Sequence, residues 1–144
     1  MNQKFDIFIS YKRKSLNTAY LLYTKLSQRG YSVFLDIEEL GPGEFDEQIY
    51  RYIDGVSDVV VLIEEGSLDR WTVEQDGSPT KECLEDWFYK EVAYSYSRGK
   101  NIIPIWHDCQ IVDRILPKDV ATITKLQSKP FILHYINAYI EELE

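Results

Sequence analysis

Apolar residues along the chain form short continuous runs that alternate with stretches of helical spacing. Continuous runs bounded by polar or turn residues predict strands at residues 5–10, 31–35, 58–63 and 101–105. Apolar positions repeated every three or four residues predict helices around residues 19–26 and 45–53, in the segment that contains Trp87 and Glu91, and at 132–143. A weaker strand is predicted at 121–126, and the polar stretch 64–81 reads as a long loop.

Strands that alternate with helices predict right-handed crossovers and a parallel sheet. The run 58–63 is apolar without alternation, as expected of a central strand covered on both faces. We therefore predict an α/β, flavodoxin-like three-layer fold, with a five-stranded parallel sheet and helices on both faces. At 144 residues and 44% hydrophobic content, the chain is predicted to form a single domain spanning 1–144.

Composition and charge narrow the function classes. The net charge of -8 and the pI near 4.8 argue against binding to nucleic acid or an anionic membrane through a broad basic face. No apolar run approaches the roughly 18 to 20 residues of a membrane span, and no signal-peptide pattern precedes the first strand, so a cytoplasmic location is expected. Cys83 and Cys109 form no CxxC pair, and neither a disulfide framework nor a metal site is predicted.

Candidate chemistry gathers at one edge of the predicted sheet. Ligands of such folds bind beyond the carboxyl ends of the strands, which here places residues 10–14 and 36–44 near the loop after residue 63. Trp87 and Glu91 share one helix face, because they are four residues apart. An aromatic plate beside an acid suits cleavage of a glycosidic bond to a flat, cationic leaving group. The alternative is a packed indole beside a solvated acid.

One basic run adds a candidate for ligand binding, whereas the other chemistries considered find little support in the sequence. The basic run Lys12-Arg13-Lys14 follows the first strand and suits an anionic ligand, with a solvated turn as the alternative. His107 and His134 are lone histidines outside any recognisable nucleophile motif, and Cys83 reads as a buried thiol. A response-regulator receiver shares this sheet order, but it requires an acidic pair near the first strand and an aspartate that ends the third.

Several segments together resemble the TIR (Toll/interleukin-1 receptor) domain family, in the family's order and over nearly the whole chain. They are Phe8-Ile9-Ser10-Tyr11, Val33-Phe34-Leu35-Asp36, Glu38-Glu39-Leu40-Gly41-Pro42-Gly43-Glu44-Phe45, Trp87-Phe88-Tyr89-Lys90-Glu91 and Gly99-Lys100-Asn101-Ile102-Ile103-Pro104-Ile105. Members of this family either act as scaffolds that bind other TIR domains or cleave NAD+. The chain resembles the second class, namely the bacterial defence effectors and the axon-degeneration NADases.

The resemblance implies an NAD+ glycohydrolase in which NAD+ is the substrate and no further cofactor takes part. It places the catalytic residue at Glu91. It places the contacts to NAD+ at Ser10, Tyr11, Lys12, Arg13, Asp36, Gly43, Phe45 and Trp87. Two positions depart from the family pattern, since Lys12 stands where the axon-degeneration enzymes carry arginine, and Gly41 where related enzymes can carry an acid.

The resemblance also implies partners. Gly41-Pro42-Gly43 allows an abrupt turn, and in the family this loop mediates head-to-tail assembly with other TIR domains. The domain is expected to be one module of a larger protein, with a role in immune or antiphage defence. The product, linear or cyclic ADP-ribose, depends on pocket shape and stays open. A non-catalytic TIR scaffold remains the alternative function.

Overall fold

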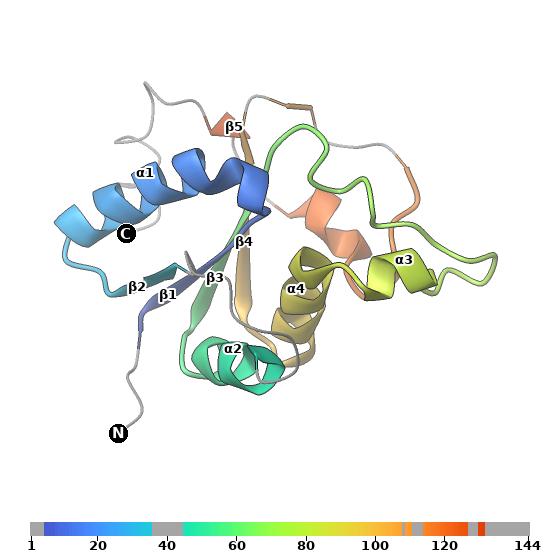
Figure 1. The fold of residues 1–144 in the computed structure, drawn as a ribbon, viewed down its shortest axis with the longest axis horizontal. Helices are drawn as coiled ribbons and strands as arrows, with labels where there is room; N and C mark the ends of the chain where they lie inside the picture. The colour runs from blue at the N-terminus through green and yellow to red at the C-terminus, as the bar shows by residue number, and fades with distance from the viewer. Residues whose placement is uncertain (1–4, 36–44, 108, 111–113, 127–129, 132–144) are drawn as a thin grey trace.

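A parallel sheet forms the centre of the molecule (Figure 1). The computed structural model describes residues 5–35, 45–107, 109–110, 114–126 and 130–131, and the side chains of 45–47 and 130–131 are not described. The strands that form the body of the sheet are β1 (Ile7–Ser10), β2 (Val33–Leu35), β3 (Asp58–Ile63) and β4 (Asn101–His107). The hydrogen-bonded order is β2-β1-β3-β4-β5, and each described pair is parallel. The predicted parallel α/β sheet is confirmed.

Helices cover both faces of this sheet. Figure 1 shows α1 (Leu16–Gln28) on one side, and α2 (Phe45–Asp54) and α4 (Trp87–Ser97) on the other. A short helix, α3 (Lys81–Leu84), precedes α4, and a 3-10 turn, η1 (Arg13–Ser15), precedes α1. The predicted helices around residues 19–26 and 45–53 are therefore confirmed, and the predicted Trp87 helix begins at Trp87 itself.

The alternation of side chains along the strands divides the core into two clusters. Ile7 and Ile9 of β1 pack with Leu22 and Leu26 of α1, whereas Phe8 packs on the opposite face, with the cluster that includes residues of α2 and α4. Ser10 has the same parity as Phe8, so its side chain belongs to the α4 side of the sheet. This parity places Ser10 opposite the helix that carries Glu91.

The edge strand lies at a different place from the one predicted. A weak strand was predicted at residues 121–126, but Ala121–Lys125 form a 3-10 helix, η2. Val120 and Ile123 are both fully buried, and a spacing of three residues places them on one side of a 3-10 turn. Among the described residues, the chain instead joins the sheet at β5 (Pro130–Phe131), which pairs with Trp106 and His107 at the end of β4.

Some predictions concern residues outside the described ranges. The helix predicted at 132–143 and the loop 36–44 belong to this group. The long loop predicted at 64–81 is confirmed as a loop up to Thr80, and it folds back on itself through an isolated bridge between Val73 and Pro79. None of the described helices combines the length and apolarity that a bilayer crossing demands.

Candidate functional site

The carboxyl ends of β1, β3 and β4 meet at one edge of the sheet. Ser10 is in register with Val61, and Ile63 with Trp106, so the segments that follow these strands begin side by side. In parallel sheets of this order, this edge is the usual place for ligands. Of the predicted contact residues, Ser10 to Arg13 lie at this edge.

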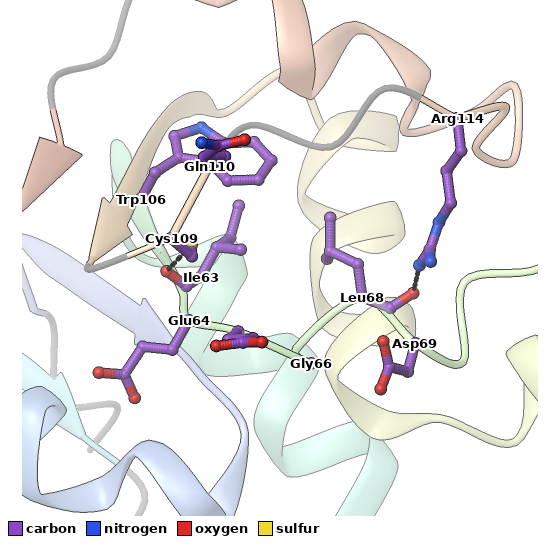
Figure 2. Close-up of a pocket in the computed structure, with 10 residues that line it drawn as sticks. Ile63, Glu64, Gly66, Leu68, Asp69, Trp106, Cys109, Gln110 and Arg114 are labelled. Carbon is purple, nitrogen blue, oxygen red and sulfur yellow. Dashed lines mark hydrogen bonds between the residues drawn. The ribbon is translucent and has the colours of Figure 1, made fainter.

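A cavity of about 390 Å³ opens beyond the ends of β3 and β4 (Figure 2). Its lining residues are Ile63, Glu64, Glu65, Gly66, Leu68, Asp69, Trp106, Cys109, Gln110 and Arg114. The Arg114 guanidinium donates to the Leu68 carbonyl, and the Cys109 thiol lies 3.5 Å from the Ile63 carbonyl. None of these lining residues belongs to the set predicted to bind NAD+.

The carboxylate of Glu64, at the end of β3, connects three elements. Its Oε2 accepts from Thr18 Oγ1 of α1 at 2.9 Å and lies 2.5 Å from Nδ1 of His107, the last residue of β4. Burial raises the pKa of Glu64, but the nearby hydroxyls of Ser15 and Thr18 and the His107 ring lower it by more, so the pKa lies below its ordinary value. His107 is therefore not the isolated histidine that its place in the sequence indicated.

Glu91 is the acid that the sheet edge holds most directly. It lies on the buried side of α4, with Phe88, Val92 and Ser95, and is 9% exposed. Its Oε1 accepts a hydrogen bond of 2.7 Å from the hydroxyl of Ser10, which is fully buried. A carboxylate fixed in this way at the end of β1 is oriented before any ligand arrives.

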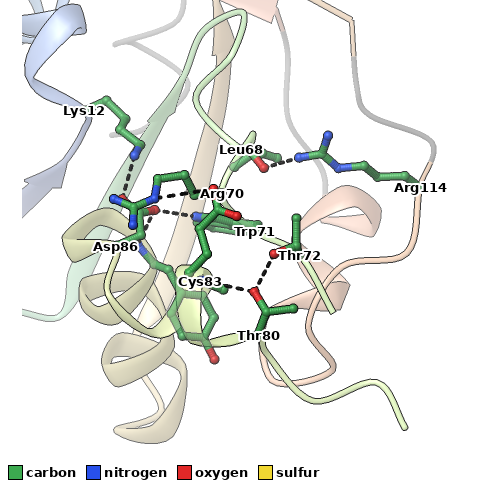
Figure 3. A network of polar contacts seen from close by, with 11 residues as sticks. Lys12, Leu68, Arg70, Trp71, Thr72, Thr80, Cys83, Asp86 and Arg114 are labelled. Carbon is green, nitrogen blue, oxygen red and sulfur yellow. Dashed lines mark hydrogen bonds and ion pairs between the residues drawn. The ribbon is translucent and has the colours of Figure 1, made fainter. Parts of the chain in front are cut away.

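Asp86 caps the helix that carries Glu91. The backbone N–H of Tyr89 donates to Asp86 Oδ2 at 3.3 Å, which satisfies one of the free donors of the first turn. The same oxygen accepts from Trp71 Nε1 at 3.1 Å, and Oδ1 accepts from Lys12 Nζ at 2.6 Å (Figure 3). Asp86 is 4% exposed, so its charge is compensated by close donors and not by water.

The other predicted contact residues fall in different surroundings. Trp87 is half-buried, and the Lys90 ammonium lies 4.5 Å from the centroid of its ring. Tyr11 packs against the core cluster on the α1 face, away from Glu91, and Arg13 is exposed at the start of η1. The structure thus brings Ser10 and Glu91 together, and Lys12 to the start of the same helix.

Three predicted residues cannot be placed in the site. Asp36 and Gly43 lie outside the described residues. Phe45 begins α2, as predicted, but its side chain is not described.

A model of the TIR domain family matches residues 7–132 of the chain. The chain belongs to the TIR domain family. Its parallel sheet with helices on both faces is thus the fold of a TIR domain.

Curated relatives of this TIR domain carry the name NAD(+) hydrolase. NAD(+) hydrolase tir-1 of Caenorhabditis elegans is 30% identical over 142 residues, covering 96% of this chain and 14% of that protein. NAD(+) hydrolase SARM1 of Danio rerio is 30% identical over 140 residues, covering 96% of this chain and 19% of that protein. NAD(+) hydrolase sarm1 of Drosophila melanogaster is 31% identical over 148 residues, covering 100% of this chain and 10% of that protein. The chain therefore spans less than a fifth of the length of these relatives.

Solved structures share the fold at low identity. A metazoan TIR-STING receptor from C. gigas superposes with a TM-score of 0.66 at 16% identity, covering 95% of this chain and 38% of that one. A CMP N-glycosidase, BcmB, from Clostridium botulinum superposes with a TM-score of 0.56 at 14% identity, covering 96% and 97%. At these identities the likeness concerns the fold.

Sequence reasoning missed Asp86, Trp71 and the pairing of Glu64 with His107. Asp86 carried a usable signal, since an aspartate directly before a helical run is a favoured N-cap. The other two depend on contacts between distant segments and left no local signal. Cys83 was predicted to be a buried thiol, which is confirmed, and burial raises its pKa to about 11, so it is protonated and unreactive at neutral pH.

Within the described residues, no group of three or more His, Cys, Asp or Glu side chains is arranged to hold a metal ion.

Proposed function

We propose that this TIR domain is an NAD+ glycohydrolase that cleaves the bond between nicotinamide and ribose. The observation that carries the proposal is the 2.7 Å hydrogen bond between Ser10 and Glu91, which orients a buried acid one helical turn from Trp87. The names of the relatives at about 30% identity support the same reaction.

Glu91 is the catalytic residue of the proposed reaction. Its carboxylate approaches the ribose that carries nicotinamide and stabilises the positive charge that develops on the sugar as the bond breaks. Nicotinamide leaves as a neutral molecule and needs no proton, so one acid is sufficient. Attack by water gives ADP-ribose, and attack by an adenine nitrogen of the same molecule gives cyclic ADP-ribose.

The remaining contacts hold the substrate. We assign the aromatic surface for nicotinamide to Trp87 and Phe45, and the charge that meets the pyrophosphate to Lys12 and Arg13. We assign Ser10 to the orientation of Glu91, because its single O–H proton is donated to that carboxylate. Tyr11, Asp36 and Gly43 complete the contacts that the family resemblance implies.

Assembly is part of the proposed function. Head-to-tail association with other TIR domains completes the site, and the loop 36–44 is the assembly element. The domain acts as one module of a larger protein, and it depletes NAD+ or produces a signal during immune or antiphage defence. These roles follow from the resemblance, and they define the conditions of the test.

The test is release of nicotinamide from NAD+ by the purified chain, clustered on a multivalent scaffold, with products separated by chromatography. We expect the wild type to release nicotinamide and Glu91→Gln to lose about a hundredfold or more of the rate. The amide keeps the size of the side chain and an oxygen that can accept from Ser10, so the fold is retained. The second product distinguishes linear from cyclic ADP-ribose.

Glu85→Gln is the matched control. It makes the same change at an exposed acid just before α4 and is expected to leave the rate unchanged. If Glu91→Gln released nicotinamide at the wild-type rate, Glu91 would not be the catalytic residue. No release from a verified cluster would favour the scaffold function, with TIR-TIR binding as its activity.

A further inference from the structure

Asp86 links three separate segments of the chain through its two carboxylate oxygens. Oδ1 accepts from the Lys12 ammonium, which follows β1, while Oδ2 accepts from the Trp71 indole and from the backbone of Tyr89. Figure 3 shows the Lys12 side chain and the Trp71 ring converging on Asp86 from different elements. Trp71 is fully excluded from solvent, so its indole N–H, one of the three donors, is fixed in the core.

The end of β1 is joined to α4 at two points. Ser10 donates to Glu91, and Lys12, two residues further on, pairs with Asp86 at the N-terminus of the same helix. The acid and the ammonium are thereby held by one pair of elements. A shift of either element would move both groups.

We propose that Asp86 is a positioning residue of the NAD+ site, which holds Lys12 in place for the substrate's pyrophosphate. This inference rests on the function proposed above. An ammonium has three N–H donors, and Asp86 takes one, so Lys12 can contact a phosphate oxygen while it stays paired. A lysine side chain is otherwise a flexible point charge, and fixing it in advance reduces the entropy lost on binding.

Asp86→Asn separates this role from helix capping. An asparagine has one side-chain oxygen and is also a good N-cap, so that oxygen can keep the contacts to Trp71 and Tyr89. The amide nitrogen then faces Lys12, where it cannot accept a hydrogen bond. The variant is expected to fold and to release Lys12.

The experiment measures steady-state kinetics of nicotinamide release by the clustered chain. We expect Asp86→Asn to raise KM for NAD+ by about three- to tenfold with a smaller change in kcat, because Lys12 holds the phosphates and not the reacting bond. In a Lys12→Met background, Asp86→Asn is expected to have no further effect on KM. Dissociation constants for NAD+, measured with Glu91→Gln and with Glu91→Gln/Asp86→Asn, are expected to differ by the same factor.

Two controls separate positioning from folding. Asp119→Asn removes a carboxylate that accepts from the Tyr89 hydroxyl at 2.6 Å, next to α4 but away from Lys12, and is expected to leave KM unchanged. The indole N–H resonance of Trp71, assigned with Trp71→Phe, is expected to stay near its wild-type position in Asp86→Asn. A lost or strongly shifted resonance would mean that the capping side of Asp86 was also disrupted, and would overturn the proposed separation of roles.

The outcomes also separate this inference from the proposed function. A wild type that cleaves NAD+, together with an Asp86→Asn variant of unchanged KM, would overturn the positioning role and leave the glycohydrolase intact. If Asp86→Asn raised KM by the same factor in the wild type and in the Lys12→Met background, the positioning role would likewise be overturned. If the wild type neither bound nor cleaved NAD+, the proposed glycohydrolase function itself would be contradicted.

Discussion

The Ser10 hydroxyl makes the contact with the most direct consequence for Glu91. Ser10 is fully buried and donates to a carboxylate 81 residues later in the chain. A single well-placed hydrogen bond to a charged group is typically worth about 1.5 to 3 kcal/mol. Its chief effect here is to restrict the rotamers of Glu91 to one that faces the end of β1.

Ser10→Ala is expected to lower kcat for nicotinamide release by roughly tenfold, because Glu91 loses the donor that orients it. The measurement is kcat from the clustered chain, with the melting temperature followed in parallel. Ser67→Ala is the matched control, since Ser67 is also fully buried, and its hydroxyl accepts from the backbone N–H of Glu64 after β3. An equal loss of kcat in both variants would show that packing, and not the bond to Glu91, explains the effect.

At the scale of elements, Glu64 holds α1 and β4 against the end of β3. Its carboxylate contacts Thr18 of α1 and His107 of β4, and its backbone N–H donates to the buried Ser67 hydroxyl at 2.9 Å. Gly66, within the same turn, has φ of +85°, and the Lys14 ammonium occupies the space that a Cβ would need. The turn after β3 is thus fixed by its own residues and by η1.

The pKa of Glu64 gives this contact a pH dependence. The pKa lies below its ordinary value of 4.5, so the stabilisation is complete above that value and is lost as the pH falls below it, through the folded-state pKa. At neutral pH, Glu64→Gln is expected to lower the free energy of unfolding by about 1 kcal/mol. The difference from wild type is expected to shrink at about pH 4 and below.

Urea unfolding at neutral pH and under acid conditions measures this difference. Glu65→Gln, at the exposed neighbouring acid, serves as the control and is expected to show little effect at either pH. If the difference in the free energy of unfolding between wild type and Glu64→Gln stayed constant or grew as the pH fell, it would contradict a lowered pKa for Glu64.

At the scale of the whole molecule, the proposed activity depends on association between chains. If head-to-tail contacts complete the site, the rate per chain depends on the local concentration of chains, and clustering on a scaffold raises that concentration to the millimolar range. We expect clustering to increase nicotinamide release per chain by at least about tenfold over dilute chain. Rates measured across a dilution series, free and clustered, test this expectation. A rate per chain that is constant across the series would indicate a site complete within one chain.

The chain matches only a small part of the length of its relatives, and this bears on the clustering experiment. The three relatives named NAD(+) hydrolase extend far beyond the segment matched here, which covers 10% to 19% of their length. Regions outside a TIR domain can control how closely several copies approach one another. An artificial scaffold therefore replaces that control in the experiment.

Local patterns determined much of this molecule. Apolar runs predicted β1 to β4. The structure shows that the side chains of β1 alternate between the two faces of the sheet, with Phe8 on one face and Ile7 and Ile9 on the other. The four-residue spacing of Trp87 and Glu91 placed both on one helix, which α4 confirms. These features depend on residues close together in the sequence, so periodicity and propensity are sufficient to find them.

Only the tertiary structure decided which of these residues meet. The pairs Ser10 with Glu91, Lys12 with Asp86, and Glu64 with His107 join elements 43 to 81 residues apart. Their contacts depend on strand order and helix packing, which no local pattern contains. The strand predicted at 121–126 was wrong for the same reason, because burial of Val120 and Ile123 in the core favours a 3-10 turn over the extended form that the local sequence indicated.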